Sequence, residues 1–110
     1  MKQLTPSENR QMERFVLGLK KMLGSNFVRA VLFGSRARNA GNEDSDVDVL
    51  VVIRKTSMEI KHKIWDLAND IFLETEIDIS PLVMTEERME TLLKRERLLA
   101  KTITEEGIAL

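Results

Sequence analysis

Apolar side chains recur every three or four positions between residues 5 and 24, which predicts an amphipathic helix. Thr5, Pro6 and Glu8 form the capping-box pattern that opens such a helix, and Gly24 is a typical residue to end it. The expected buried face consists of Met12, Phe15, Val16, Leu19, Met22 and Leu23. This first element is therefore expected to pack on a core.

Two runs with strand character follow. Residues 27–33 are β-branched and aromatic and lead into Gly34-Ser35, which predicts a strand that ends in a turn. Residues 36–45 are rich in Asn, Gly, Asp and Ser, as is typical of a loop. Residues 46–53 alternate as a strand does, with Val47, Val49, Val51 and Ile53 on one face and Asp46, Asp48, Leu50 and Val52 on the other. The alternation separates the carboxylates from the core.

The second half of the chain is predicted to form a helix, a strand and a further helical region. A second capping box at Thr56 to Glu59 opens a helix whose expected stripe is Ile60, Ile64, Leu67, Ala68, Ile71 and Phe72. Residues 76–84 predict a third strand, and Pro81 indicates that this strand lies at a sheet edge or ends there. Thr85 then caps a helical region that ends near Gly107, with or without a break near Arg95, and its apolar side is Met89, Leu92, Leu93 and Leu99. This order predicts an α/β or α+β class.

The composition excludes several classes of protein and of functional site. The chain has 110 residues, 17 Lys+Arg against 18 Asp+Glu and no Cys. Its length favours one domain over residues 1–110, and the lack of Cys excludes a disulfide scaffold, a thiolate zinc site and a Cys nucleophile. The net charge of -1 argues against broad electrostatic capture of nucleic acid. No membrane span or signal peptide is visible, so we expect a cytoplasmic protein.

The candidate functional residues are three carboxylates and one turn. Asp46 and Asp48 share a strand face, and Asp78 on the third strand can share it too. Such carboxylates raise one another's pKa unless cations compensate, which favours Mg²⁺, although solvated surface Asp residues are the alternative. The Gly34-Ser35 turn favours the metal site, because Gly lets a ligand approach the backbone and a Ser hydroxyl can hold phosphate oxygens.

These residues carry a family resemblance. The segment Gly34 to Asn39, followed by Ser45 to Val52, resembles the signature of the nucleotidyltransferase superfamily related to DNA polymerase β, and most of all the minimal nucleotidyltransferases. The resemblance implies a small α+β fold with a mixed sheet of three or more strands flanked by three or four helices. It also implies that Gly34 and Ser35 hold the triphosphate of ATP. Asp46, Asp48 and Asp78 would bind two Mg²⁺ ions, and Asp78 would accept the proton of the acceptor hydroxyl.

Two cations flank the turn. Arg36 and Arg38 would either neutralise the β and γ phosphates or serve as surface charges. On the second predicted helix, His62 is expected to face solvent, and Trp65 is expected at the core edge rather than as a base-stacking platform.

The resemblance also implies a partner. Minimal nucleotidyltransferases pair with HEPN-domain toxins and act as antitoxins by transferring AMP from ATP to a hydroxyl of the toxin, typically a Tyr. Because the chain is too short for an acceptor-binding domain, we expect the acceptor to come from another protein. One alternative is an antitoxin that neutralises its partner by contact alone. Another is transfer to a small molecule, for which a homodimer would build the acceptor pocket. The choice of nucleotide and acceptor is not encoded in these motifs.

Overall fold

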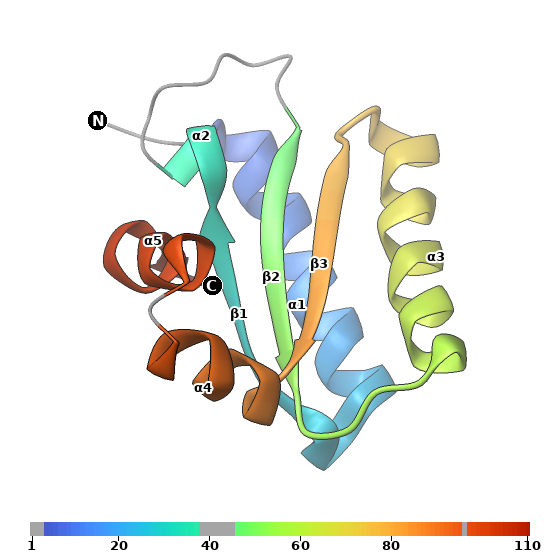
Figure 1. Cartoon of the computed structure of the whole chain (residues 1–110). Coiled ribbons are helices and arrows are strands. Elements are labelled where there is room, and N and C mark those ends of the chain that lie inside the picture. Colours follow the sequence, from blue (N-terminus) through green and yellow to red (C-terminus); the bar gives the residue numbers. More distant parts are fainter. Residues whose placement is uncertain (1–3, 38–45, 96) are drawn as a thin grey trace.

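The computed structural model describes residues 4–37, 46–95 and 97–110 (Figure 1). Its α-helices are α1 (Pro6–Leu23), α2 (Gly34–Ala37), α3 (Met58–Thr75), α4 (Glu86–Lys94) and α5 (Leu98–Glu106). A 3₁₀ turn at Gly24–Asn26 follows α1. The strands are β1 (Phe27–Phe33), β2 (Val47–Ile53), β3 (Ile79–Thr85) and β4 (Ile108–Ala109).

The strands form one mixed sheet in the order β3-β2-β1-β4. Strand β1 is antiparallel to both β2 and β4, whereas β2 and β3 are parallel and are joined through α3. Pro81 lies in the edge strand β3, as predicted, because a residue without an N–H is tolerated where no further strand pairs. The expected α+β class with a mixed sheet is confirmed.

The core lies on both faces of β2. The odd-numbered residues of β2 pack with α1 and α3, while Leu50 and Val52 pack with α4 and α5. Helices α1 and α3 therefore cover one face of the sheet and α4 and α5 the other (Figure 1). The predicted alternation along β2 is confirmed, and its apolar residues are almost fully buried, as is typical of a central strand.

Helix α1 begins as its sequence predicts. The Glu8 N–H donates to the Thr5 hydroxyl oxygen at 3.1 Å, and the Thr5 N–H donates to the Glu8 carboxylate at 2.8 Å. Gly24, with a φ of 54°, ends the helix. In α3 the N-cap is Ser57 rather than Thr56, because the Ser57 hydroxyl accepts the Ile60 N–H at 3.2 Å. The predicted second capping box is therefore wrong: the N3 position is Ile60, which has no side-chain acceptor, so only the Ser57 half of such a motif forms.

Several boundaries differ from the sequence pattern. Strand β2 begins at Val47, directly after Asp46, and β3 spans Ile79–Thr85 rather than 76–84, because α3 continues to Thr75. The helical region after Thr85 does break, at Arg95, which changes the helical phase and leaves Leu99 49% exposed. Met22 and Phe72 are also partly exposed. Residues 36–37 belong to α2 instead of the predicted loop, and 38–45 lie outside the described residues. No helix in the described ranges is long and apolar enough to cross a membrane.

Candidate functional site

The end of β1 and the beginnings of β2 and β3 meet at one end of the sheet. Because β1 is antiparallel to β2 and β2 is parallel to β3, the end of β1 lies beside the beginnings of β2 and β3 (Figure 1). Phe33 pairs with Asp48, and the Val47 N–H donates to the Asp78 carbonyl oxygen at 2.9 Å. The predicted site residues gathered at this end of the sheet are Gly34, Asp46, Asp48 and Asp78.

The carboxylates influence one another through Asp46. Burial raises the pKa of the half-buried Asp48, and the charge of Asp46 adds to this effect. Asp78 lies at the surface, yet partial loss of hydration raises its pKa, and the charge of Asp46 and a hydrogen bond with that side chain add to it. Asp46 is thus the common neighbour of two carboxyl groups whose pKa values its charge raises. A cation bound here would relieve the repulsion.

The donor set suits a hard cation that arrives with a substrate. Asp46 and its two neighbours offer only carboxylate oxygens, which Mg²⁺ prefers. Within the described ranges, no three such side chains form a ready-made metal cluster. Mg²⁺ usually binds through one or two carboxylates together with water and substrate phosphates, so a cage made of protein alone is not required. Asp46 with Asp48, or with Asp78, can therefore hold Mg²⁺ alongside a nucleotide.

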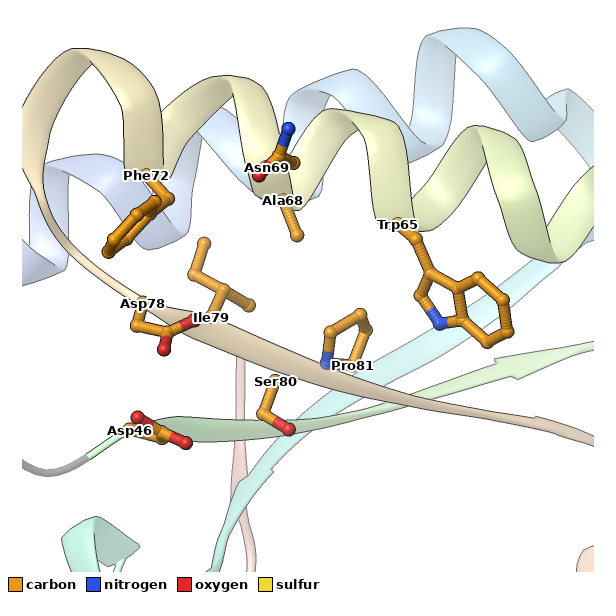
Figure 2. A pocket seen from close by; sticks show the side chains of 9 residues that line it. All are labelled: Asp46, Trp65, Ala68, Asn69, Phe72, Asp78, Ile79, Ser80 and Pro81. Atoms are coloured by element: carbon orange, nitrogen blue, oxygen red, sulfur yellow. The ribbon is translucent and has the colours of Figure 1, made fainter.

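A pocket of about 450 Å³ opens beside two of these carboxylates (Figure 2). It lies between α3 and the start of β3, and we call it the α3–β3 pocket. Its lining includes Asp46, Asp78, Trp65, Asn69, Phe72 and Pro81. Trp65, expected at the core edge, is 41% exposed and forms a wall of this pocket. His62 is exposed, as expected, and its ring makes an edge-on contact with Trp65 at 5.4 Å between centroids.

Gly34 makes room for Asp48. Its φ is 76°, and a Cβ built at this position would lie 2.3 Å from Asp48 Oδ2. Only glycine combines this left-handed backbone with so close an approach of a carboxylate. The turn and the carboxylate that the sequence paired are therefore in contact. The backbone of Ser35 follows in α2.

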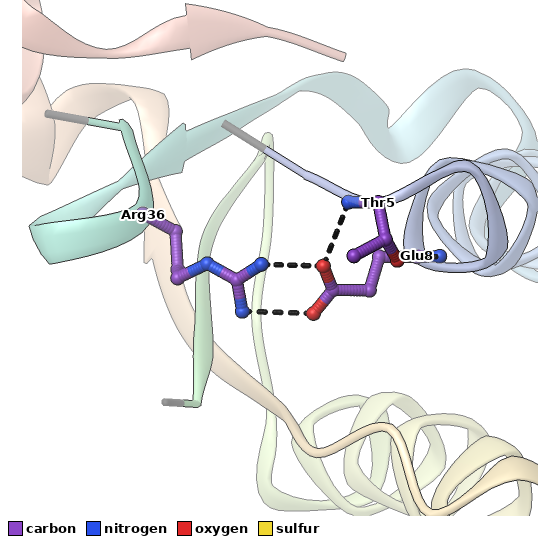
Figure 3. A network of polar contacts seen from close by, with 3 residues as sticks. All are labelled: Thr5, Glu8 and Arg36. Carbon is purple, nitrogen blue, oxygen red and sulfur yellow. Dashed lines mark hydrogen bonds and ion pairs between the residues drawn. The ribbon is translucent and has the colours of Figure 1, made fainter. Parts of the chain in front are cut away.

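Arg36 is buried and forms an ion pair with helix α1. Its Nη1 donates to Glu8 Oε2 at 2.8 Å, and its Nη2 donates to Glu8 Oε1 in a second bond (Figure 3). The side chain is only 4% exposed, so Arg36 is not the surface charge that was one of the two expectations. It forms a buried ion pair between α2 and α1, and its contact with a phosphate stays a prediction. Arg38 lies outside the described residues.

Sequence comparison identifies the family. A model of the nucleotidyltransferase domain family matches residues 12–110. The chain belongs to this family. Among its relatives, one protein of Methanocaldococcus jannaschii, named as a protein adenylyltransferase, is 35% identical over 72 residues, which cover 64% of this chain and 73% of the relative. Another of the same organism and name is 31% identical over 81 residues, covering 74% and 77%. The chain is thus a nucleotidyltransferase, as its signature indicated.

Solved structures share the fold of this nucleotidyltransferase. A structure described as a minimal nucleotidyltransferase superposes with a TM-score of 0.60 at 25% identity, covering 100% of this chain and 97% of the other. A toxin–antitoxin crystal structure with AMP-PNP gives a TM-score of 0.58 at 20% identity, covering 88% and 70%. The expected minimal nucleotidyltransferase fold is confirmed.

Proposed function

We propose that this nucleotidyltransferase transfers AMP from ATP, with Mg²⁺, to a hydroxyl of a partner HEPN-domain toxin, and that it thereby acts as the antitoxin. The acceptor is a Tyr hydroxyl, and the reaction takes place in the cytoplasm. The observation that carries the proposal is the position of Asp46 between Asp48, which lies against the Gly34 turn, and Asp78, which lines a pocket. The protein adenylyltransferase relatives and the toxin–antitoxin structure support it.

Each group has a role in the proposed reaction. Gly34 and Ser35 receive the triphosphate, while Asp46, Asp48 and Asp78 hold Mg²⁺, which neutralises phosphate charge when it is bound. The acceptor oxygen forms a bond to the α-phosphorus, and the bond from that phosphorus to the bridging oxygen breaks. Pyrophosphate leaves with the electron pair, and the hydroxyl proton passes to the Asp78 carboxylate.

Labelled nucleotide tests this proposal directly. The chain is incubated with Mg²⁺, the purified partner and ATP labelled at either the α or the γ phosphate. We expect the α label on the partner, together with a mass gain of AMP groups, and no γ label. A partner that keeps its mass, although it binds the antitoxin, would overturn the proposal.

Carboxylate variants separate catalysis from contact. Asp46→Asn keeps the size of the side chain and removes its charge, so the proposal expects loss of both AMP transfer and toxin neutralisation. Asp66→Asn, on the exposed surface of α3, is the matched control and should retain both activities. If Asp46→Asn still neutralises the toxin, neutralisation is by contact and the antitoxin mechanism is refuted.

A further inference from the structure

The α3–β3 pocket lies on one side of Asp46 and the Gly34 turn on the other. Of the residues described, the lining contains Asp46 and Asp78 but neither Gly34 nor Asp48. Gly34 and Asp48 instead contact each other at the end of β1. Asp46 therefore separates two compartments of the candidate site.

The wall of the pocket is one face of α3. Trp65, Ala68, Asn69 and Phe72 follow the three-four spacing of a helical face, and all of them line the pocket. Trp65 and Phe72 are each 41% exposed, whereas the small Ala68 between them is buried. Phe72 lies at the Asp78 end and Trp65 at the Pro81 end, so a gap separates the two rings (Figure 2).

The geometry of in-line displacement places the acceptor on the Asp78 side of the site. This step rests on the proposed function. In an in-line displacement, the attacking and leaving oxygens lie on opposite sides of the phosphorus. If the triphosphate occupies the Gly34 side, the acceptor enters from the side of Asp78. The α3–β3 pocket opens on that side.

We propose that the α3–β3 pocket binds the acceptor, and that Trp65 and Phe72 select an aromatic hydroxyl, the Tyr side chain of a partner protein. The Tyr ring packs between the two exposed aromatic side chains, and its hydroxyl donates to the Asp78 carboxylate. An aliphatic hydroxyl of Ser or Thr would leave both aromatic walls uncovered. The 110 residues contain no Tyr, so a Tyr in this pocket comes from outside them.

Steady-state kinetics with a Tyr-containing peptide of the partner test the pocket. Trp65→Ala and Phe72→Ala are each expected to raise the acceptor KM by about tenfold or more, since aromatic contacts and buried ring area are lost. The affinity for a non-hydrolysable ATP analogue with Mg²⁺ should stay within about twofold, and Trp65→Phe should restore most of the acceptor KM. Leu73→Ala is the matched control, because Leu73 lies on α3, is 71% exposed and does not line the pocket.

Two kinetic outcomes would overturn the assignment. An unchanged acceptor KM in Trp65→Ala and Phe72→Ala would exclude the aromatic walls as the acceptor site. Weaker binding of the ATP analogue in these variants, with the acceptor KM unchanged, would identify the pocket as a base site instead. In both cases AMP transfer by the wild type continues, so the proposed function survives.

Fluorescence tests the pocket even if no transfer occurs. Trp65 is the sole Trp of the chain, so its emission reports on this pocket alone. With Mg²⁺ and the ATP analogue present, N-acetyltyrosinamide is expected to change the emission in a saturable way, and N-acetylserinamide is not. Phe72→Ala should weaken the response to the Tyr compound several-fold. An equal response to both compounds, or none, would refute selection of an aromatic hydroxyl.

Discussion

The two sides of Asp46 are built in different ways. On the Gly34 side, the turn contacts Asp48 directly, and the buried Arg36–Glu8 pair joins α2 to α1. On the Asp78 side, exposed aromatic side chains border an open pocket. A side whose described residues are held by direct contacts suits a group that is the same in every reaction, such as a triphosphate. The open side suits a group supplied by a partner, so the difference indicates where each substrate belongs.

The largest loss of activity is expected when Asp48, on the Gly34 side, loses its charge. Asp48→Asn is expected to lower AMP transfer about 1000-fold or more, since it removes a charge that holds Mg²⁺. The same change should raise the melting temperature. Burial and Asp46 raise the pKa of Asp48, so its ionised form destabilises the fold, and this penalty grows as pH rises from the ordinary Asp pKa through the raised one. Calorimetry at pH 7 measures the melting temperature. A lower melting temperature in Asp48→Asn would contradict the view that the charge of Asp48 destabilises the fold.

Disrupting the ion pair on the Gly34 side should destabilise the whole fold. Glu8→Gln is expected to cost about 3 kcal/mol of unfolding free energy, because breaking one partner of a buried pair leaves the other poorly compensated. Urea unfolding measures this loss. Glu74→Gln is the matched control, since the Arg14–Glu74 pair is exposed and its loss should leave the urea midpoint unchanged.

The ion pair also predicts a pH dependence. Burial tends to raise the pKa of Glu8, but hydrogen bonds from Arg36 and Thr5 and the charge of Arg36 together outweigh it and leave the pKa below its ordinary value. The stabilisation is therefore present above the ordinary Glu pKa and is lost as pH falls through the lowered one. The difference in unfolding free energy between wild type and Glu8→Gln should shrink across that acidic window. Parallel pH curves would contradict this.

A methyl group at the turn tests the Gly34–Asp48 contact. Gly34→Ala is expected to cost about 1–3 kcal/mol and to weaken binding of an ATP analogue by about tenfold, because the new Cβ meets both a positive φ and the Asp48 carboxylate. Gly24→Ala is the matched control. Its φ is also positive, at 54°, but nothing lies within 4 Å of its Cβ, so it should show backbone strain without any loss of nucleotide affinity. Equal nucleotide binding by both variants would argue against a functional contact.

The smallest effect is expected where α3 ends, next to the open side. Glu76 has a left-handed φ of 62°, which glycine adopts without steric cost. Glu76→Gly should raise the unfolding free energy by about 0.5 kcal/mol, because relief of strain exceeds the added entropy of the unfolded chain. Thermal unfolding measures this change. A destabilised variant would show that the entropy added by glycine outweighs the strain relieved at Glu76.

The sequence predicts the fold well because its signals are local. Capping residues, the alternation along β2 and the proline in β3 each determine structure within a few positions. The contact between Arg36 and Glu8 joins residues that lie 28 positions apart, so no local pattern could reveal it. Trp65 illustrates a second limit. A helical stripe has the same spacing whether it is covered by a sheet or borders a pocket, and only the position of α3 at the sheet edge decides between them.

The separation of the two sides can be measured through the single indole of the chain. In two-dimensional NMR, Trp65 gives one indole N–H signal, and Gly34 gives a backbone amide signal. Adding Mg²⁺ and a non-hydrolysable ATP analogue is expected to shift the Gly34 signal and leave the indole in place. A Tyr-containing peptide of the partner, added next, should then shift the indole. If the nucleotide alone shifts the indole to saturation, both substrates share the α3–β3 pocket and the two-sided account is wrong.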